Sequence, residues 1–151
     1  MRIIEDNLQS PDVLKLLREH LQEVASLSPP DSVHALDVQE LRSPGVSFWT
    51  AWNGAELLGC GALQEMCADH AEIKSMRTAA AHLGQGVGSA LLTHLINEAR
   101  KRGYTRLSLE TGSAAEFTPA HSLYRKFGFR FCDPFGGYQE DPHSRFMTRT
   151  I

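Results

Sequence analysis

The amino-acid sequence predicts a mixed α/β fold in which one central sheet is flanked by helices. Strand-like and helix-like patterns follow one another in the order β, α, α, β, β, β, α, β, α, β, β. Two of the strand patterns are joined by Asn53-Gly54, the strongest short signal for a β-hairpin. The chain has 151 residues, the size of one domain with a buried core. We therefore expect a single domain over residues 1–151.

The N-terminal third begins with a short strand over residues 1–5. Ser10 and Pro11 then indicate the start of a helix, with a capping serine and proline in the first helical position. Apolar residues at helical spacing continue this helix to Val24, and the turn-rich segment after it ends the pattern. A short second helix is expected over residues 37–41.

Three strands follow, over residues 46–52, 55–63 and 71–78, and the first two form the hairpin. A long helix over residues 84–102 comes next, and Gly103 supplies its C-terminal stop.

The remaining chain repeats the alternation of strand and helix. A strand over residues 105–111 precedes a helix over residues 118–126, which Gly128 ends. Two strand patterns, 129–135 and 145–151, complete the chain. An antiparallel meander thus leads into βαβ-like units around one sheet.

The composition is that of a soluble globular protein, with 42% hydrophobic and 22% charged residues and a net charge of −3. No apolar run is long enough to span a membrane, and the N-terminus lacks the apolar region of a secretory signal. The one basic run, residues 100–102, complements the dipole of a predicted helix C-terminus. We expect a cytoplasmic protein without nucleic-acid or membrane partners.

The cysteines and histidines predict neither a disulfide framework nor a metal site. The three cysteines are far apart and form no CxxC pair, and the seven histidines form no HExxH motif. We expect reduced, partly buried thiols and no bound metal.

The stretch HLGQGVGSALL, residues 82–92, places glycines at every second position directly before a helix. A glycine turn between a strand and a helix exposes the unpaired N–H groups of the first helical turn. These groups and the helix dipole favour an anion, and glycine lets a diphosphate approach the backbone closely. A plain tight turn explains the same residues, so both interpretations stay open here. Residues 84–89 are called the glycine turn below.

Two common nucleotide motifs fit the glycine turn poorly. A P-loop requires a lysine after the glycines, and none is present. A dinucleotide fingerprint requires a small residue at Ser89 or Leu91, where Ser89 is marginal and Leu91 fails. Glu110 ends the following strand as the acidic ribose ligand of that fold does, so a small dinucleotide-dependent oxidoreductase remains a distant alternative.

A family resemblance fits better. MRTAAAHLGQGVGSALL (76–92) resembles the acetyl-CoA-binding motif of the GNAT N-acetyltransferases, [RQ]-x-x-G-x-[GA] followed by a helix. PAHSLYRKFGF (119–129) resembles the family block A-x-x-L-Y-x-K-x-G-F, with matches at Ala120, Leu123, Tyr124, Lys126, Gly128 and Phe129. The resemblance covers nearly the whole chain. It implies an acetyl-CoA-dependent N-acetyltransferase whose mostly antiparallel sheet is splayed at the fourth strand and flanked by about four helices.

The resemblance also implies where acetyl-CoA binds. The backbone of the fourth strand should contact the pantetheine at Met76, Arg77 and Thr78. The diphosphate should lie on the glycine turn and its entrance, formed by Leu83, Gly84, Gln85, Gly86, Val87, Gly88 and Ser89. Leu83 stands where the family usually has Arg or Gln, and Phe117 where a pantetheine-contacting Asn is common. These departures keep open a non-catalytic module that binds or senses acyl-CoA.

By the same resemblance, Tyr124 is the general acid that protonates the departing thiolate, although it could instead be a core tyrosine. Glu72 is our candidate for the general base, because strand alternation places it on one face with Lys74 and Met76. Glu72 could instead form an ion pair with Lys74 or be exposed to solvent, and Glu110 or bulk water is the competing base.

Family members usually bind the acceptor at the loop between the first two helices and at the last hairpin. His34, Glu110 and Tyr138 are the residues we expect to contact it there. Acidic side chains in these segments would suit a cationic amine: Asp31, Asp37, Glu140 and Asp141. We expect direct acetyl transfer, within a ternary complex, to a primary amine of a small molecule. Pairing of exposed strands makes a homodimer possible.

Overall fold

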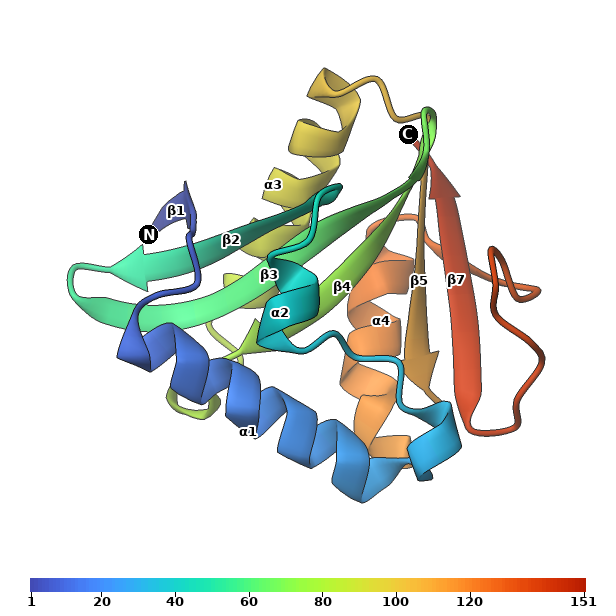
Figure 1. Cartoon of the computed structure of the whole chain (residues 1–151), viewed down its shortest axis with the longest axis horizontal. Helices are drawn as coiled ribbons and strands as arrows, with labels where there is room; N and C mark the ends of the chain where they lie inside the picture. Colours follow the sequence, from blue (N-terminus) through green and yellow to red (C-terminus); the bar gives the residue numbers. More distant parts are fainter.

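The computed structural model describes residues 1–151 and shows a seven-stranded sheet with the strand order β1-β2-β3-β4-β5-β7-β6 (Figure 1). The predicted order of strands and helices is confirmed. The elements are β1 (Arg2–Glu5), α1 (Pro11–Leu27), η1 (Pro30–Ser32), α2 (Val38–Leu41), β2 (Val46–Asn53), β3 (Glu56–Cys67), β4 (His70–Thr78), η2 (Ala80–His82), α3 (Val87–Lys101), β5 (Arg106–Gly112), η3 (Ala115–Phe117), α4 (Thr118–Lys126), β6 (Arg130–Cys132) and β7 (Ser144–Thr150). None of the helices combines the length and apolar composition needed to cross a membrane.

Helices cover both faces of the sheet, with α1 and α2 in front and α3 and α4 behind in Figure 1. On the α1 face, Leu16 and Leu17 pack with Phe48 in one apolar cluster. On the α3 face, Leu92 and Leu95 belong to a larger cluster that also includes residues of β3, β4, β5 and α4.

Several predicted boundaries move for identifiable reasons. Strand β3 continues to Cys67 because it pairs with β4 along nearly its whole length. Helix α3 begins at Val87 rather than at Gly84, because Gly84 and Gly86 have left-handed φ angles of 73° and 82°. Strand β6 covers only residues 130–132 of the predicted 129–135.

The predicted hairpin turn is present in the structure, whereas the predicted serine cap is not. Asn53-Gly54 joins β2 and β3 as predicted, with a φ of 59° at Gly54. Ser10 precedes α1, but its hydroxyl makes no capping hydrogen bond, so the expected serine cap is wrong. Asp37 instead caps α2 in a reciprocal capping box with Glu40.

The sheet splits between β4 and β5. These neighbours are parallel, and only residues 70–72 of β4 pair with residues 106–108 of β5. Beyond this contact the strands diverge, and α4 is visible through the gap in Figure 1. The predicted splay at the fourth strand is therefore present.

A bulge in β4 changes which side chains share a face. Ala62 of β3 pairs with Lys74, whereas Cys60 pairs with Arg77, so Ser75 and Met76 together oppose one residue. Ser75 adopts a left-handed φ of 54°. Met76 consequently points to the α3 face, where it packs on the same cluster as Leu95. The expectation that Met76 shares a face with Glu72 and Lys74 is wrong.

Candidate active site

An inner cavity of about 120 Å³ occupies the gap between β4 and β5. Side chains from both faces of the sheet line it, including His34, Met76, Glu110, Phe117 and Tyr124. The split sheet thus brings together residues predicted to bind the cofactor, to bind the acceptor and to act in catalysis.

Tyr124 reaches this cavity from α4. Only 6% of the residue is exposed, and its ring packs against Phe129 at a centroid distance of 5.7 Å. Its hydroxyl makes no hydrogen bond with another protein group, and burial raises the pKa of the phenol well above its ordinary value. Tyr124 is therefore both a core residue and a protonated phenol that lines the cavity.

Glu110 lines the same cavity from the opposite face of the sheet. Leu107 and Leu109 point into the cluster beneath α3 and α4, so alternation directs Glu110 toward the α1 face. Burial raises the pKa of the Glu110 carboxyl to about 7, although the nearby Lys74 partly opposes the shift. A carboxyl with this pKa can accept and release a proton near neutral pH.

Glu72 is engaged with other protein groups. It is 5% exposed, and its Oε2 accepts hydrogen bonds from the Tyr138 hydroxyl at 2.5 Å and from the Lys74 ammonium at 3.2 Å. Lys74 also donates to the His34 carbonyl at 3.0 Å and to the Tyr138 oxygen at 2.9 Å. The ion pair considered as the alternative role of Glu72 is thus present.

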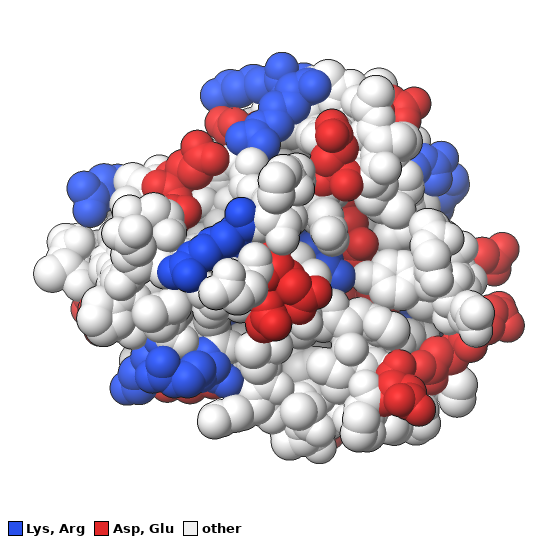
Figure 2. Space-filling model, viewed as in Figure 1, with Lys and Arg blue, Asp and Glu red and all other residues white.

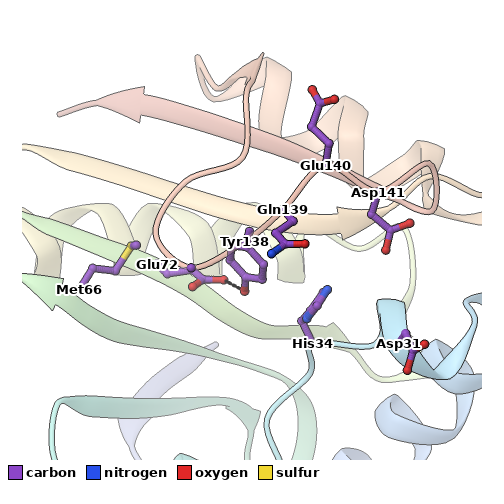
Figure 3. A pocket seen from close by; sticks show the side chains of 9 residues that line it. Asp31, His34, Met66, Glu72, Tyr138, Gln139, Glu140 and Asp141 are labelled. Carbon is purple, nitrogen blue, oxygen red and sulfur yellow. Dashed lines mark hydrogen bonds between the residues drawn. The ribbon is translucent and has the colours of Figure 1, made fainter.

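An outer cavity of about 490 Å³ adjoins this network and shares His34 with the inner cavity (Figure 3). The rings of His34 and Tyr138 meet edge to face with centroids 5.0 Å apart. The Ser32 hydroxyl donates to Asp141 at 2.5 Å, which ties η1 to the loop between β6 and β7. The structure therefore brings the two predicted acceptor segments into contact.

Acidic side chains line this outer cavity, although Glu140 points away from its centre in Figure 3. In Figure 2 acidic groups gather at the lower right, where η1 and the loop before β7 lie. Lys74 neutralises Glu72 within the network, so Asp31 and Asp141 carry the unbalanced negative charge at the opening. Asp37 does not line the cavity, because its side chain caps α2.

The glycine turn presents a row of free donors. None of the backbone N–H groups of residues 84–89 donates to a backbone acceptor, and the first such bond comes from Ala90 to Gly86. A Cβ atom added to Gly84 or Gly86 would meet no other atom within 4 Å, so the surface in front of the turn is open. This arrangement fits the oxygens of a diphosphate.

The other predicted cofactor residues have different surroundings. Arg77 forms an ion pair with Glu23 of α1. Phe117 packs over Gly112, where an added Cβ would lie 2.1 Å from the ring. Leu83 is 66% exposed at the entrance to the glycine turn.

A comparison with known proteins identifies the family. The profile of the Acetyltransferase (GNAT) family matches residues 11–129. The chain belongs to the GNAT acetyltransferase family. It is therefore an acetyl-CoA-dependent acyltransferase, and the oxidoreductase alternative is wrong.

Three relatives of this GNAT enzyme cover between 92% and 100% of its length. The uncharacterized N-acetyltransferase YsnE of Bacillus subtilis is 54% identical over 100% of both chains. YedL of Escherichia coli, also an uncharacterized N-acetyltransferase, is 49% identical over 97% of this chain and 92% of its own. An IAA acetyltransferase of Azospirillum brasilense is 36% identical over 92% and 90% of the two chains.

Solved structures of GNAT proteins share the fold. A Klebsiella pneumoniae protein assigned provisionally as an acyl-CoA N-acyltransferase is 28% identical, with a TM-score of 0.77 over 99% of this chain and 96% of that one. A GNAT acetyltransferase of Elizabethkingia anophelis with acetyl-CoA bound is 21% identical, with a TM-score of 0.70 over 99% and 97%.

Two polar residues of the GNAT enzyme's inner cavity escaped the sequence analysis. His20 of α1 has a buried Nδ1 without a hydrogen-bond partner, and burial with the nearby Arg77 lowers its pKa to about 4. The hydroxyl of Ser75 is also buried without a partner. His20 lies in an ordinary amphipathic helix and Ser75 in an unforeseen bulge, so neither carries a sequence signal.

Proposed function

We propose that this enzyme transfers the acetyl group of acetyl-CoA directly to a primary amine of a small molecule within a ternary complex. The observation that carries the proposal is the pairing of Glu110 with Tyr124 at one cavity. A carboxyl with a pKa of about 7 and a protonated phenol face this cavity from opposite sides of the sheet. A base that deprotonates the ammonium and an acid that protonates the departing thiolate both accelerate amine acetylation.

In the proposed reaction, Glu110 accepts a proton from the substrate ammonium. The neutral nitrogen then attacks the thioester carbonyl, and a C–N bond forms. As the tetrahedral intermediate collapses, the C–S bond breaks and Tyr124 donates its proton to the sulfur. The remaining excess proton on nitrogen passes through solvent to the Tyr124 phenolate, and Glu110 releases the proton that it accepted to solvent. Backbone groups around Met76, Arg77 and Thr78 polarise the thioester carbonyl.

The structure favours Glu110 over Glu72 as the base. One oxygen of Glu72 already accepts from both Tyr138 and Lys74. Proton uptake by Glu72 would weaken its ion pair with a buried lysine, which is costly. Glu72 is better suited to hold Tyr138 and Lys74 in place beside the acceptor.

Acetyl-CoA is proposed to bind with its diphosphate on the free N–H groups of residues 84–89, and Phe117 to lie beside the pantetheine. The acidic lining of the outer cavity supports a cationic acceptor, with His34 and Tyr138 as contacts. A homodimer and a cytoplasmic location remain predictions.

Release of CoA in the presence of an amine library tests this proposal. The library should contain linear and aromatic amines and also IAA, because a relative that is 36% identical is named an IAA acetyltransferase. Initial rates measured at varied concentrations of both substrates should give intersecting lines in a double-reciprocal plot. Parallel lines would indicate a covalent acetyl-enzyme and would contradict transfer in a ternary complex.

A further inference from the structure

His82 lies immediately before the glycine turn and is bonded to two other segments. Its Nδ1 is 3.2 Å from Oε1 of Gln85, and its Nε2 is 2.7 Å from Oε1 of Glu56. Gln85 stands between the two left-handed glycines of the turn, and Glu56 is the first residue of β3. The side chain of His82 is only 15% exposed.

These two contacts favour the protonated form of His82. A carboxylate oxygen and a carboxamide oxygen are hydrogen-bond acceptors only. Nε2 therefore donates to Glu56, and Nδ1 also donates to Gln85 when the ring is an imidazolium. The hydrogen bonds to Gln85 and Glu56 also raise the pKa of His82.

We propose that the His82 imidazolium is a positioning residue for the diphosphate of acetyl-CoA. It supplies, from one position earlier in the chain, the polar anchor that is missing at Leu83. The inference rests on the proposed binding of diphosphate at the glycine turn.

Two physical effects would act together at this position. The hydrogen bond from His82 holds Gln85 and thereby fixes the backbone between Gly84 and Gly86, whose N–H groups face the ligand. With its oxygen occupied by His82, the Gln85 carboxamide keeps its NH₂ group free to donate.

The proposal predicts a defined dependence of cofactor binding on pH. Glu56 is the one ionisable side chain bonded to His82. Affinity for CoA should be full below the pKa of His82 and should fall as the pH rises through it. Because this pKa is raised above the ordinary histidine value of 6.5, the loss of affinity should occur on the alkaline side of that value.

Calorimetric titration of the whole enzyme with CoA, without amine, tests the inference from about pH 6 to pH 9. Wild-type affinity for CoA should fall about tenfold over this range. A change of this size corresponds to the net contribution of one hydrogen bond to a charged group. The His82→Asn variant should bind CoA about tenfold more weakly at pH 6 and show a flatter dependence. The Glu56→Gln variant should shift the loss to lower pH, because it removes the anion that stabilises the imidazolium.

Two further measurements separate the possible explanations. Dephospho-CoA, which lacks the 3′-phosphate, should show the same His82-dependent change; loss of that change would place His82 at the 3′-phosphate and overturn the assignment. The exposed His143, changed to Asn, serves as a control for overall charge and should bind CoA as the wild type does.

Unchanged CoA affinity and pH dependence in a folded His82→Asn variant would overturn the role of His82. Failure of the wild-type enzyme to bind CoA at any pH would instead contradict the proposed site on the glycine turn. The two outcomes are therefore distinguishable.

Discussion

Glu110 and Glu72 illustrate how surroundings decide the chemistry of identical side chains. Both are acidic residues of central strands, yet Glu72 accepts hydrogen bonds from Lys74 and Tyr138, whereas burial holds the pKa of Glu110 at about 7. A base must be deprotonated to act, so the rate of acetyl transfer should rise as the pH increases through about 7 and level off above it.

The Glu110→Gln variant tests this role. We expect it to lower kcat about 100-fold at pH 8 and to remove the acidic limb of the pH–rate profile, because an amide cannot accept the ammonium proton. Glu72→Gln is the matched control: it should retain an acidic limb near pH 7, while weakening the bonds to Lys74 and Tyr138. Loss of the limb in the control alone would restore Glu72 as the base.

Tyr124→Phe removes one oxygen from a well-packed ring. We expect kcat to fall by about 100-fold, since the thiolate would leave without a proton donor, while the Kd for acetyl-CoA changes less than threefold. Steady-state kinetics and calorimetry measure the two quantities. A variant with normal turnover would show that Tyr124 has only a structural role.

For individual residues, the sequence predicted only contacts between residues that lie close together in the chain. The contact between Lys74 and Glu72, two residues apart on a strand, could be anticipated from alternation. The hydrogen bond from Tyr138 to Glu72 spans 66 positions and depends on how a long loop folds back. The shifted pKa values of His20 and Glu110 likewise arise from burial that only the folded structure creates.

Among the elements, the glycine turn offers a controlled test of cofactor binding. Gly86→Ala introduces a side chain at a left-handed φ of 82°, which should strain the turn and disorder its N–H groups. We expect its Kd for acetyl-CoA to increase about tenfold and its stability to fall by about 1 kcal/mol.

Gly103→Ala is the matched control, because Gly103 has a φ of 86° and equally open surroundings beyond the end of α3. It should lose similar stability in thermal unfolding but keep the wild-type Kd. Equal effects of both variants on Kd would argue against a special role for the turn.

The bulge in β4 shows why sequence periodicity was insufficient for the rest of this element. An alternating pattern predicts strand faces only while each residue has one partner. Ser75 adds a residue opposite β3 without the glycine that often marks such a position, and this addition reverses the face of Met76. The strand itself was therefore predictable, whereas the orientation of its functional half was not.

For the whole molecule, Glu110 couples the active site to stability. Its pKa in the folded state, about 7, exceeds the ordinary value of 4.5, so the folded protein binds this proton more tightly than the unfolded chain. The resulting stabilisation is complete below about pH 4.5 and is lost as the pH rises through 7. Glu110→Gln should therefore raise Tm by a few degrees at pH 8 and change it little at pH 5.

Thermal unfolding of both proteins across this range measures the effect. A constant difference in Tm at all pH values would show that Glu110 does not titrate as described.

The split between β4 and β5 has a further consequence at this scale. Glu110 and Tyr124 reach the inner cavity from opposite faces, so we expect the amine and the thioester to approach each other through the sheet. The sheet would then separate the two substrates everywhere except at the narrow gap between β4 and β5. A compound in which the amine is linked covalently to CoA would have to pass through that gap. Its amine end would bind on one face of the sheet and its CoA end on the other. Such a conjugate should leave the enzyme far more slowly than either half, because release requires one end to be drawn back through the opening.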